Sequence, residues 1–404
     1  MSIRKLFIFT VTFAGLAGVT FGQSQRFTRE SFAEKFNPQL TAVPFLTIAP
    51  DSRAGAMGDA GVASTPDVHS QHWNAAKYAF IESDAAVSLS YAPWLRQLGI
   101  NDINLLYLVG YKKLDARQTI SGSLRYFSLG EIIFTDIEGI AQGNYNPNEF
   151  AIDAGYSLQL SQRFAGNISF RFIRSDLTGG RSFSGSGESK AGIAGGADLG
   201  FYYQNNDIEL SDRDSELAWG IQLSNMGTKI SYNENQTPDF LPINMRLGGR
   251  LTTHMDEYNS FSFMVDLNKY LIPTPPYYYD ADSNEVVKED PSVAFIKGYD
   301  PDVSVPLGMI RSFYDAPGGF KEELKEIMYS LGVEYMYRNQ FAIRAGYFHE
   351  AELKGNRKYV TLGVGIRLNV FGLDFSYLAP TTGQNNPLAN TVRFTLSFNF
   401  DANQ

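Results

Sequence analysis

The sequence predicts an all-β protein, a transmembrane antiparallel β-barrel of about fourteen strands with an N-terminal helical plug. Three observations lead to this prediction: alternating apolar and polar residues along most of the chain, an aromatic content of 14%, and an N-terminal export signal. The segment TVRFTLSFNF near the C-terminus shows the pattern most clearly, with bulky apolar residues on every second position. Because successive strand side chains point to opposite faces, such strands have one apolar and one polar face.

The N-terminus has the features of an export signal. Arg4 and Lys5 precede an apolar run, and the small residues Thr20 and Gly22 come before Gln23. This order is typical of a secretory signal peptide, here residues 1–22, and the run is too short for a membrane helix. We therefore expect a protein exported to the outer membrane, which it crosses many times with strands.

Composition excludes several classes of function. The chain has no cysteine, so disulfides, thiol catalysis and thiolate metal sites are excluded. Its net charge of -9 and pI of about 5.1 argue against nucleic acid as a partner. We expect no cofactor.

Residues 23–83 lack strand alternation and are expected to fold into the lumen as a plug. A short helix is expected within 51–63, capped by Asp51 or Ser52, and a second helix over 67–80, opened by Asp67. The candidate plug residues are Asp51, Arg53, Met57, Asp59, Trp73 and Asn74.

Residues 84–404 are expected to form the barrel. The candidate strands are 84–93, 102–112, 117–128, 149–160, 163–176, 190–204, 216–226, 242–253, 259–270, 328–337, 340–350, 357–368, 370–379 and 390–401. Short connections alternate with longer ones, which is typical of the periplasmic and extracellular ends of an outer-membrane barrel. The sixth connection, 205–216, is expected to be a longer exception. An even strand count places both barrel termini on the periplasmic side.

The ninth connection, 271–327, is by far the longest and is expected to be extracellular. It contains proline, tyrosine and acidic residues, and the sequence KEELKEIM predicts an amphipathic helix over 321–328. A connection of this length is usually functional or mobile.

Six arginines fall on the polar face of their strands and are expected to line the lumen. A lipid-facing arginine at mid-depth would cost about 2–4 kcal/mol, so the polar face is the favourable one. These residues are Arg171, Arg246, Arg250, Arg344, Arg367 and Arg393.

The sequence contains two weak metal-site patterns. His69 and His72 have the i, i+3 spacing of a helical zinc pair, but no acidic third ligand stands at a suitable spacing. Asp280, Asp282 and Asn284 resemble the start of a calcium loop, yet Pro291 stands where the bidentate glutamate belongs. A structural plug helix and a solvated acidic loop are the preferred interpretations, and no metal site is predicted.

No catalytic residues are predicted. Serine, histidine and aspartate side chains are expected in the lumen and loops, but no nucleophile-elbow motif is present. The glycine-rich stretch 184–200 lacks the lysine and the strand–helix context of a phosphate-binding loop.

The first extracellular connection carries the apolar residues Trp94, Leu95, Leu98 and Ile100. One interpretation is an aromatic girdle at the membrane boundary. The alternative is an exposed apolar tip that inserts into a protein partner.

The plug sequence DSRAGAMGDAGVAS, the following HWNAAKYA and the YAPWL after the first strand resemble the PorV (LptO) family. These are type IX secretion system barrels of Bacteroidota, within the wider class similar to the fatty-acid transporter FadL. That class usually has an asparagine-proline-alanine triplet where this chain has Asn74-Ala75-Ala76.

The resemblance implies a non-enzymatic shuttle. Such proteins bind the C-terminal signal domains of secreted cargo and the large translocon barrel, and pass cargo to a cell-surface attachment complex. Trp94 and Leu95 would then approach the translocon. Two alternatives stay open: a FadL-like channel for hydrophobic small molecules, and a lipid A deacylase.

Overall fold

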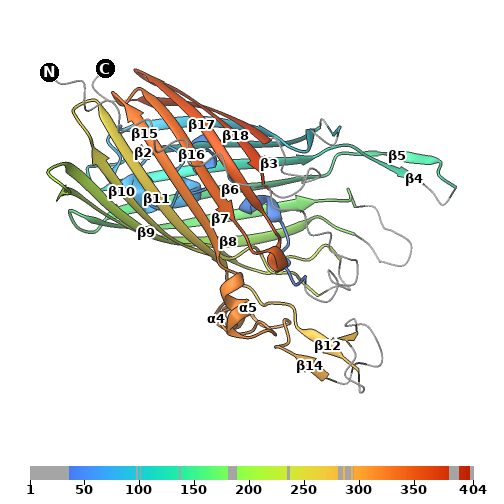
Figure 1. Ribbon diagram of the computed structural model, residues 1–404. Coiled ribbons are helices and arrows are strands. Elements are labelled where there is room, and N and C mark those ends of the chain that lie inside the picture. Colours follow the sequence, from blue (N-terminus) through green and yellow to red (C-terminus); the bar gives the residue numbers. More distant parts are fainter. Residues whose placement is uncertain are drawn as a thin grey trace. The chain divides into compact units, whose positions relative to one another are not determined.

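The alternating strands pair with their neighbours along the chain until the last strand returns to the first. The computed structural model describes residues 36–96, 99–100, 102–135, 138–180, 189–233, 237–280, 285–286, 293, 295–381 and 391–400. Within these residues, fourteen antiparallel strands close into a barrel, as predicted (Figure 1). Leu89 of the first strand pairs with Leu396 of the last, so neither strand keeps a free edge.

The barrel strands follow the predicted ranges closely. They are β1 (Ala85–Pro93), β2 (Ile103–Lys113), β3 (Gln118–Leu129), β6 (Asn148–Gln159), β7 (Phe164–Asp176), β8 (Gly192–Glu209), β9 (Asp214–Gly227), β10 (Asn244–His254), β11 (Asn259–Tyr270), β15 (Met328–Tyr337), β16 (Phe341–His349), β17 (Lys358–Leu368), β18 (Phe371–Pro380) and β19 (Thr391–Phe400). Polar inward side chains are mostly buried, whereas outward apolar side chains such as Leu108 and Phe263 are exposed. These outward side chains form the lipid-facing belt.

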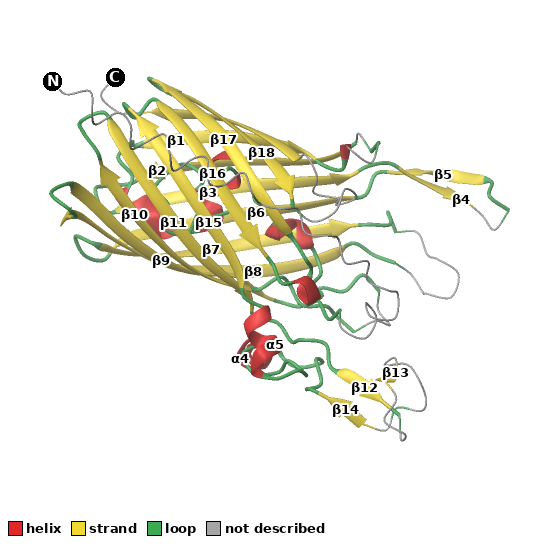
Figure 2. Cartoon of the chain, viewed as in Figure 1, coloured by secondary structure: helices red, strands yellow, loops and turns green. Residues whose placement is uncertain are grey.

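The two ends of the barrel differ. At the short-turn end, consecutive strands are joined by residues 114–117, 160–163, 210–213, 255–258, 338–340 and 369–370. At the long-loop end, the connections are longer and carry additional structure (Figure 2). The predicted length of the sixth connection was wrong, because β8 continues to Glu209 through register shifts at Ala197/Leu199 and Asn205/Ile208.

The long-loop end carries elements that the sequence did not predict. They are the hairpin β4 (Ile132–Thr135) and β5 (Ala141–Tyr145), the small sheet β12 (Tyr277–Tyr279), β13 (Glu285–Val286) and β14 (Phe295–Lys297), and the helices α4 (Val305–Arg311) and η5 (Glu352–Lys354). The helix α5 (Phe320–Lys325), in contrast, overlaps the predicted one. The helix predicted over 321–328 ends earlier, because Met328 begins β15 and packs inside the barrel against Phe348.

The N-terminal helices are short. They are η2 (Pro44–Thr47), α2 (Ser52–Gly55), α3 (Ser70–Trp73) and η3 (Ala75–Phe80). The single helix predicted over 67–80 is interrupted at Asn74, whose extended backbone and side-chain bond to the Ala76 N–H end one helix and begin the next. Among the described residues, no helix combines the length and apolar character needed to cross a membrane.

Candidate functional site: plug, lumen and long-loop end

Residues 36–84, called the plug from here on, run through the lumen from one end of the barrel to the other. At the long-loop end, the backbone N–H of Asn37 donates to Leu353 O (2.9 Å). At the short-turn end, Lys113 Nζ at the end of β2 donates to Ile81 O (3.0 Å). The chain therefore enters β1 only after it has passed through the barrel interior.

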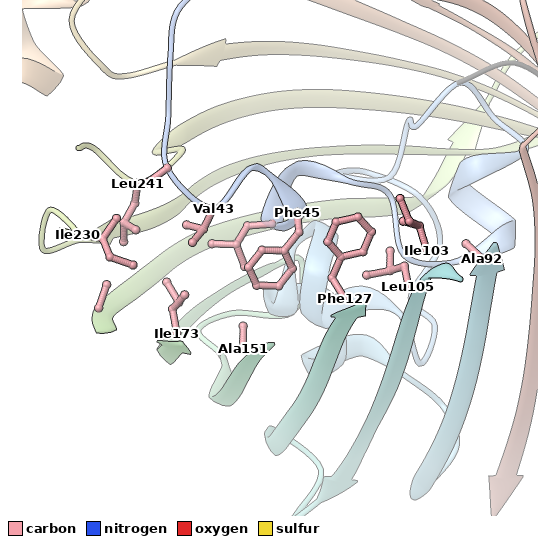
Figure 3. Packing of buried hydrophobic residues seen from close by; sticks show 13 residues of the cluster. Val43, Phe45, Ala92, Ile103, Leu105, Phe127, Ala151, Ile173, Ile230 and Leu241 are labelled. Atoms are coloured by element: carbon pink, nitrogen blue, oxygen red, sulfur yellow. The ribbon is translucent and has the colours of Figure 1, made fainter. Parts of the chain in front are cut away.

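An apolar cluster holds the plug at the long-loop end (Figure 3). Val43 and Phe45 of the plug pack against inward residues of the strands, including Leu105, Phe127 and Ile173. The rings of Phe45 and Phe127 stack with centroids 6.4 Å apart. Apolar residues on the inner face of the strands thus serve plug packing at this depth.

Deeper in the lumen, Asp51 joins two plug helices. Its Oδ2 accepts from the Ala54 N–H (2.8 Å) and caps α2, as the sequence predicted. Its Oδ1 accepts from Trp73 Nε1 (2.6 Å) at the end of α3. One buried carboxylate therefore fixes both helices.

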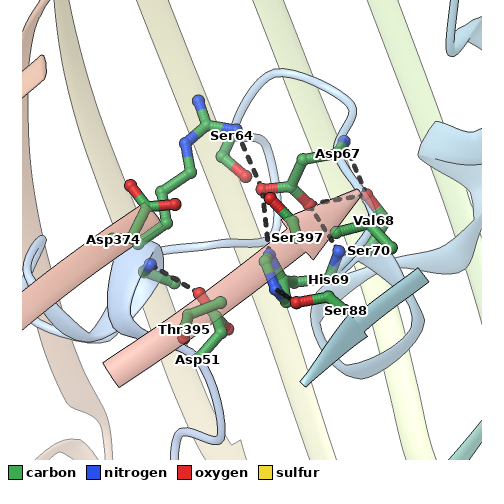
Figure 4. A network of polar contacts seen from close by, with 12 residues as sticks. Asp51, Ser64, Asp67, Val68, His69, Ser70, Ser88, Asp374, Thr395 and Ser397 are labelled. Atoms are coloured by element: carbon green, nitrogen blue, oxygen red, sulfur yellow. Dashed lines mark hydrogen bonds and ion pairs between the residues drawn. The ribbon is translucent and has the colours of Figure 1, made fainter. Parts of the chain in front are cut away.

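Arg53 connects the plug to the barrel wall. It forms ion pairs of 2.9 Å with Asp67 in the plug and with Glu334 on β15. Glu334 also pairs with Arg344 (2.6 Å), which reaches Asp374 (2.5 Å). Figure 4 shows Asp67 and Asp374 among the neighbouring polar side chains. Removing one member of such a buried ionic chain leaves an uncompensated charge, which costs about 3–5 kcal/mol.

The other predicted plug residues also contact the wall. Met57 is buried beside Met264 of β11. Asp59 accepts from Tyr359 OH (2.5 Å) and lies 4.0 Å from Arg393. Asn74 Nδ2 donates to Phe201 O (2.9 Å).

The structure places the six predicted arginines on the inner face of the barrel. Arg171 pairs with Asp153 (2.6 Å) and Asp198 (3.0 Å), and Arg250 pairs with Glu216 (2.8 Å). Arg246, Arg344 and Arg393 are buried, whereas Arg367 is half-buried at the short-turn end. The lumen is therefore charged, but most of its charges are paired.

The two plug histidines, His69 and His72, lie in different environments. His72 lies between two guanidinium groups, with Nδ1 2.7 Å from Arg125 and Nε2 3.5 Å from Arg246. This positive environment opposes cation binding. His69 Nε2 lies 2.9 Å from Ser88 Oγ of β1. Of the residues that resemble a calcium loop, only Asp280 belongs to the described part of the chain, and Asp282 and Asn284 lie outside it.

The described apolar residues of the first loop lie in two different environments. Trp94 and Leu95 are half-buried and pack on the inner apolar cluster, where Trp94 meets Phe127 edge-on at 6.2 Å. Ile100 is exposed, and Leu98 lies outside the described residues. Trp94 and Leu95 turn inward because the apolar rim around Phe127 offers them more burial than solvent does.

Residues 299–326, called the side platform from here on, cover the outer wall of the barrel at the long-loop end. Lys269 projects outward from β11, yet its ammonium group is buried between Glu323 (3.1 Å) and Glu326 (2.6 Å) of the platform. A lysine facing lipid would cost about 2–4 kcal/mol at the bilayer midplane and less near the interface. The platform removes that cost.

Sequence reasoning missed this contact, although a signal was present. Phe261, Phe263, Val265 and Leu267 occupy the outward positions of this strand, and Lys269 interrupts their apolar run. A charge in such a position indicates that something other than lipid covers it.

Two carboxyl groups of the platform have shifted pKa values. Burial, together with the nearby charges of Glu323 and Glu326, raises the pKa of Asp315 to about 7. Burial acts to raise the pKa of Glu322 also, but the hydrogen bond and charge of Lys354 hold it below its ordinary value. Asp315 is therefore the group of this pair that titrates near neutral pH.

Two cavities with polar and apolar lining residues lie near the two ends of the lumen. One of about 560 Å³ opens at the short-turn end and includes Arg250, Glu334 and Arg367 among its lining residues. Another of about 210 Å³ at the long-loop end is lined in part by Gln39 and Arg357. Both are suited to water and polar groups.

Comparisons with known proteins give a match to one family model. Residues 32–277 match the family model described as "Type IX secretion system protein PorV". A comparison with curated proteins gives no match.

The solved structures that match this chain include two toluene transporters and a FadL homologue. The toluene transporter TbuX of Ralstonia pickettii is 10% identical, with a TM-score of 0.47 over 87% of this chain and 98% of that chain. The Pseudomonas putida toluene transporter TodX is 14% identical, with a TM-score of 0.46 over 86% and 96%. A Pseudomonas aeruginosa FadL homologue is 11% identical, with a TM-score of 0.41 over 87% and 99%.

Proposed function

The chain belongs to the PorV family of type IX secretion system proteins, and from this premise we propose that it is a non-enzymatic cargo shuttle of the outer membrane. In this proposal, the barrel anchors the protein in the membrane, and its partners bind at the long-loop end. Its partners are the C-terminal signal domains of secreted cargo, the large translocon barrel of the system and the cell-surface attachment complex.

The observation that carries the proposal is the way the plug is held. Arg53 ties it to the wall through Glu334, and the plug occupies the lumen from Asn37 to Ile81. A segment fixed by buried ion pairs near its middle and by hydrogen bonds at both ends favours a function outside the lumen over passage of solutes through it.

The long-loop end offers suitable binding surfaces. The β4–β5 hairpin is a two-stranded sheet with exposed Ile132 and Ile133, and in Figure 1 it extends beyond the barrel strands. In the three-stranded sheet, β12 is central, so β13 and β14 are edge strands. Open edges of this kind can bind an extended partner segment by strand addition.

The test is cargo capture by variants that keep the barrel. Deletion of residues 131–145 removes the hairpin, and deletion of residues 277–297 removes the small sheet while leaving the side platform. We expect either deletion to reduce co-purification of secreted proteins from native outer membranes, while heat-modifiable gel mobility stays normal. Unchanged capture in both variants would contradict this assignment of the binding surface.

Native co-purification also separates the shuttle from its rivals. The shuttle predicts a very large barrel protein or proteins that share a C-terminal domain in the purified complex. A lone barrel with bound apolar small molecules would favour a channel. A changed lipid A mass spectrum after mutation of lumenal serine and histidine residues would favour a deacylase.

A further inference from the structure

The side platform has one face on the barrel and another that is left exposed by the part of the chain that the structure describes. Val305 and Met309 of α4, one helical turn apart, pack against a buried apolar cluster that includes Phe240 and Leu271, and the outward side chains Leu223 of β9 and Met245 of β10 pack against the same cluster. A Cβ on Gly308 would lie 2.9 Å from the ring of Phe240, so α4 approaches the barrel rim as closely as its backbone allows. The platform is therefore docked on the outside wall.

This docking position adjoins the lipid-facing belt directly. Met245 is paired with Leu223 across the β10–β9 ladder, and the next outward pair is Leu247 with Ile221. Leu247 is 37% exposed and belongs to the belt. The platform thus ends about 7 Å from exposed belt residues, which is the spacing of two strand residues. In Figure 1, α4 and α5 lie below the barrel, just beyond the ends of its strands.

The free face of the platform is apolar. Leu307 and Ile310 lie three residues apart on α4, and Phe320 and Leu324 lie four apart on α5, so each pair shares one side of its helix. Ile310 is 62% exposed and Phe320 is 75% exposed. Phe313 and Tyr314, between the helices, are exposed as well. Six large exposed apolar side chains in one compact element need a nonaqueous partner.

The charges of α5 are divided between its two sides. Glu323 and Glu326 are buried against Lys269, and Glu322 pairs with Lys354 (2.6 Å). In contrast, Lys321 and Lys325 are exposed. With its carboxylates turned toward the barrel, α5 presents exposed positive charge beside exposed apolar side chains. This is the combination that binds anionic membrane surfaces.

We propose that the side platform is a lipid-binding element, which inserts its free apolar face into the leaflet on the long-loop side and places Lys321 and Lys325 at anionic head groups. Continuity with the lipid-facing belt and the exposed lysines favour lipid over a protein partner. The element would fix the tilt and depth of the barrel on the β9–β11 side. This inference does not depend on the proposed secretion function.

The absence of cysteine makes a direct test possible. Single variants Ile310→Cys and Phe320→Cys of the full chain are labelled with bimane and reconstituted into phosphatidylcholine and phosphatidylglycerol vesicles with brominated acyl chains. Phe263→Cys in the belt is the lipid-exposed control. Lys297→Cys on β14, in the same long connection, is the water-exposed control. Heat-modifiable mobility checks that each labelled barrel is folded, and Leu324→Cys replaces any variant that fails this check.

We expect the fluorescence of the labels at Ile310 and Phe320 to be quenched at least about twofold more than at Lys297, and to approach the value at Phe263. Lys321→Gln together with Lys325→Gln should lessen quenching at Ile310 only when phosphatidylglycerol is present. Quenching no greater than at Lys297 would overturn the proposal. A label at Ile310 or Phe320 that brominated lipid does not quench, but that is shielded from aqueous iodide in native membranes, would indicate that a protein covers the free face. The proposal would be wrong in that case too.

Discussion

Lys269 Nζ lies 2.6 Å from Glu326 Oε2, although Lys269 projects away from the lumen and Glu326 belongs to a connection that begins after β11 has ended. The pair locks the side platform to the barrel wall. Glu326 also accepts from Lys354 (2.9 Å) and Thr274 Oγ1 (2.6 Å), so it is the centre of the docking contact.

Glu326→Gln is expected to loosen the side platform. Loss of this carboxylate leaves Lys269 and Lys354 undercompensated in a buried position, at a cost of about 3 kcal/mol. Limited proteolysis within residues 299–319 should accelerate, while the barrel stays intact on a gel. Lys269→Met in the same background should restore part of the protection, since it removes the outward charge. Lys297→Met, which changes an exposed lysine of β14 in the same connection, is the control and should have little effect.

Docking of the platform is expected to weaken between about pH 5 and pH 8. The pKa of Asp315 is raised to about 7 by burial and by Glu323 and Glu326, so the docked state favours the protonated carboxyl group. A group with a raised acid pKa contributes stability that is lost as pH rises through that pKa. Glu322, whose pKa is lowered, stays ionised over this range and adds no opposing change.

The exchange rates of the backbone amide hydrogens of residues 299–326 measure this pH dependence, after correction for the pH dependence of the intrinsic chemical exchange rate. Asp315→Asn should flatten the profile, because the amide oxygen can still accept from the Thr274 N–H that Asp315 binds at 3.2 Å. A profile that keeps its slope in Asp315→Asn would assign the pH dependence to another group.

The strands were predictable from the sequence, but the contacts that hold the plug were not. Alternation is a local pattern, so it identifies Glu334 and Arg344 as inward residues. It does not reveal that Arg53, 281 positions before Glu334, completes their ion-pair chain. The helix α5 was predicted in part, but α4 was missed because its seven residues are too few for a helical period to stand out. Only Lys269, an outward charge in an apolar run, indicated that the platform docks on the barrel wall.

Arg53→Met is expected to release the plug. It leaves Asp67 buried without its guanidinium partner and halves the compensation of Glu334, at a cost of about 3–5 kcal/mol. Planar-bilayer recordings should show a larger and noisier conductance than the unmodified barrel. Arg163→Met is the matched control, because Arg163 pairs with Asp207 at 3.0 Å in an exposed setting. That pair is worth at most about 1 kcal/mol, so the control should conduct like the unmodified protein.

A close approach of two backbones offers a second way to displace the plug without changing any charge. A Cβ on Gly346 of β16 would lie 2.0 Å from the backbone N of Gly58 in the plug, and the contact is too short to be relieved by a side-chain rotation. Gly58 itself has φ +65° and makes its own N–H bond to Thr361 Oγ1 (2.8 Å).

Gly346→Ala should therefore push the plug off the wall at a cost of about 1–3 kcal/mol and raise conductance. Gly249→Ala on β10 adds the same methyl group where no atom lies within 4 Å, so it should leave both stability and conductance unchanged. Equal conductance of the two variants would mean that the plug yields at Gly58 without leaving the lumen.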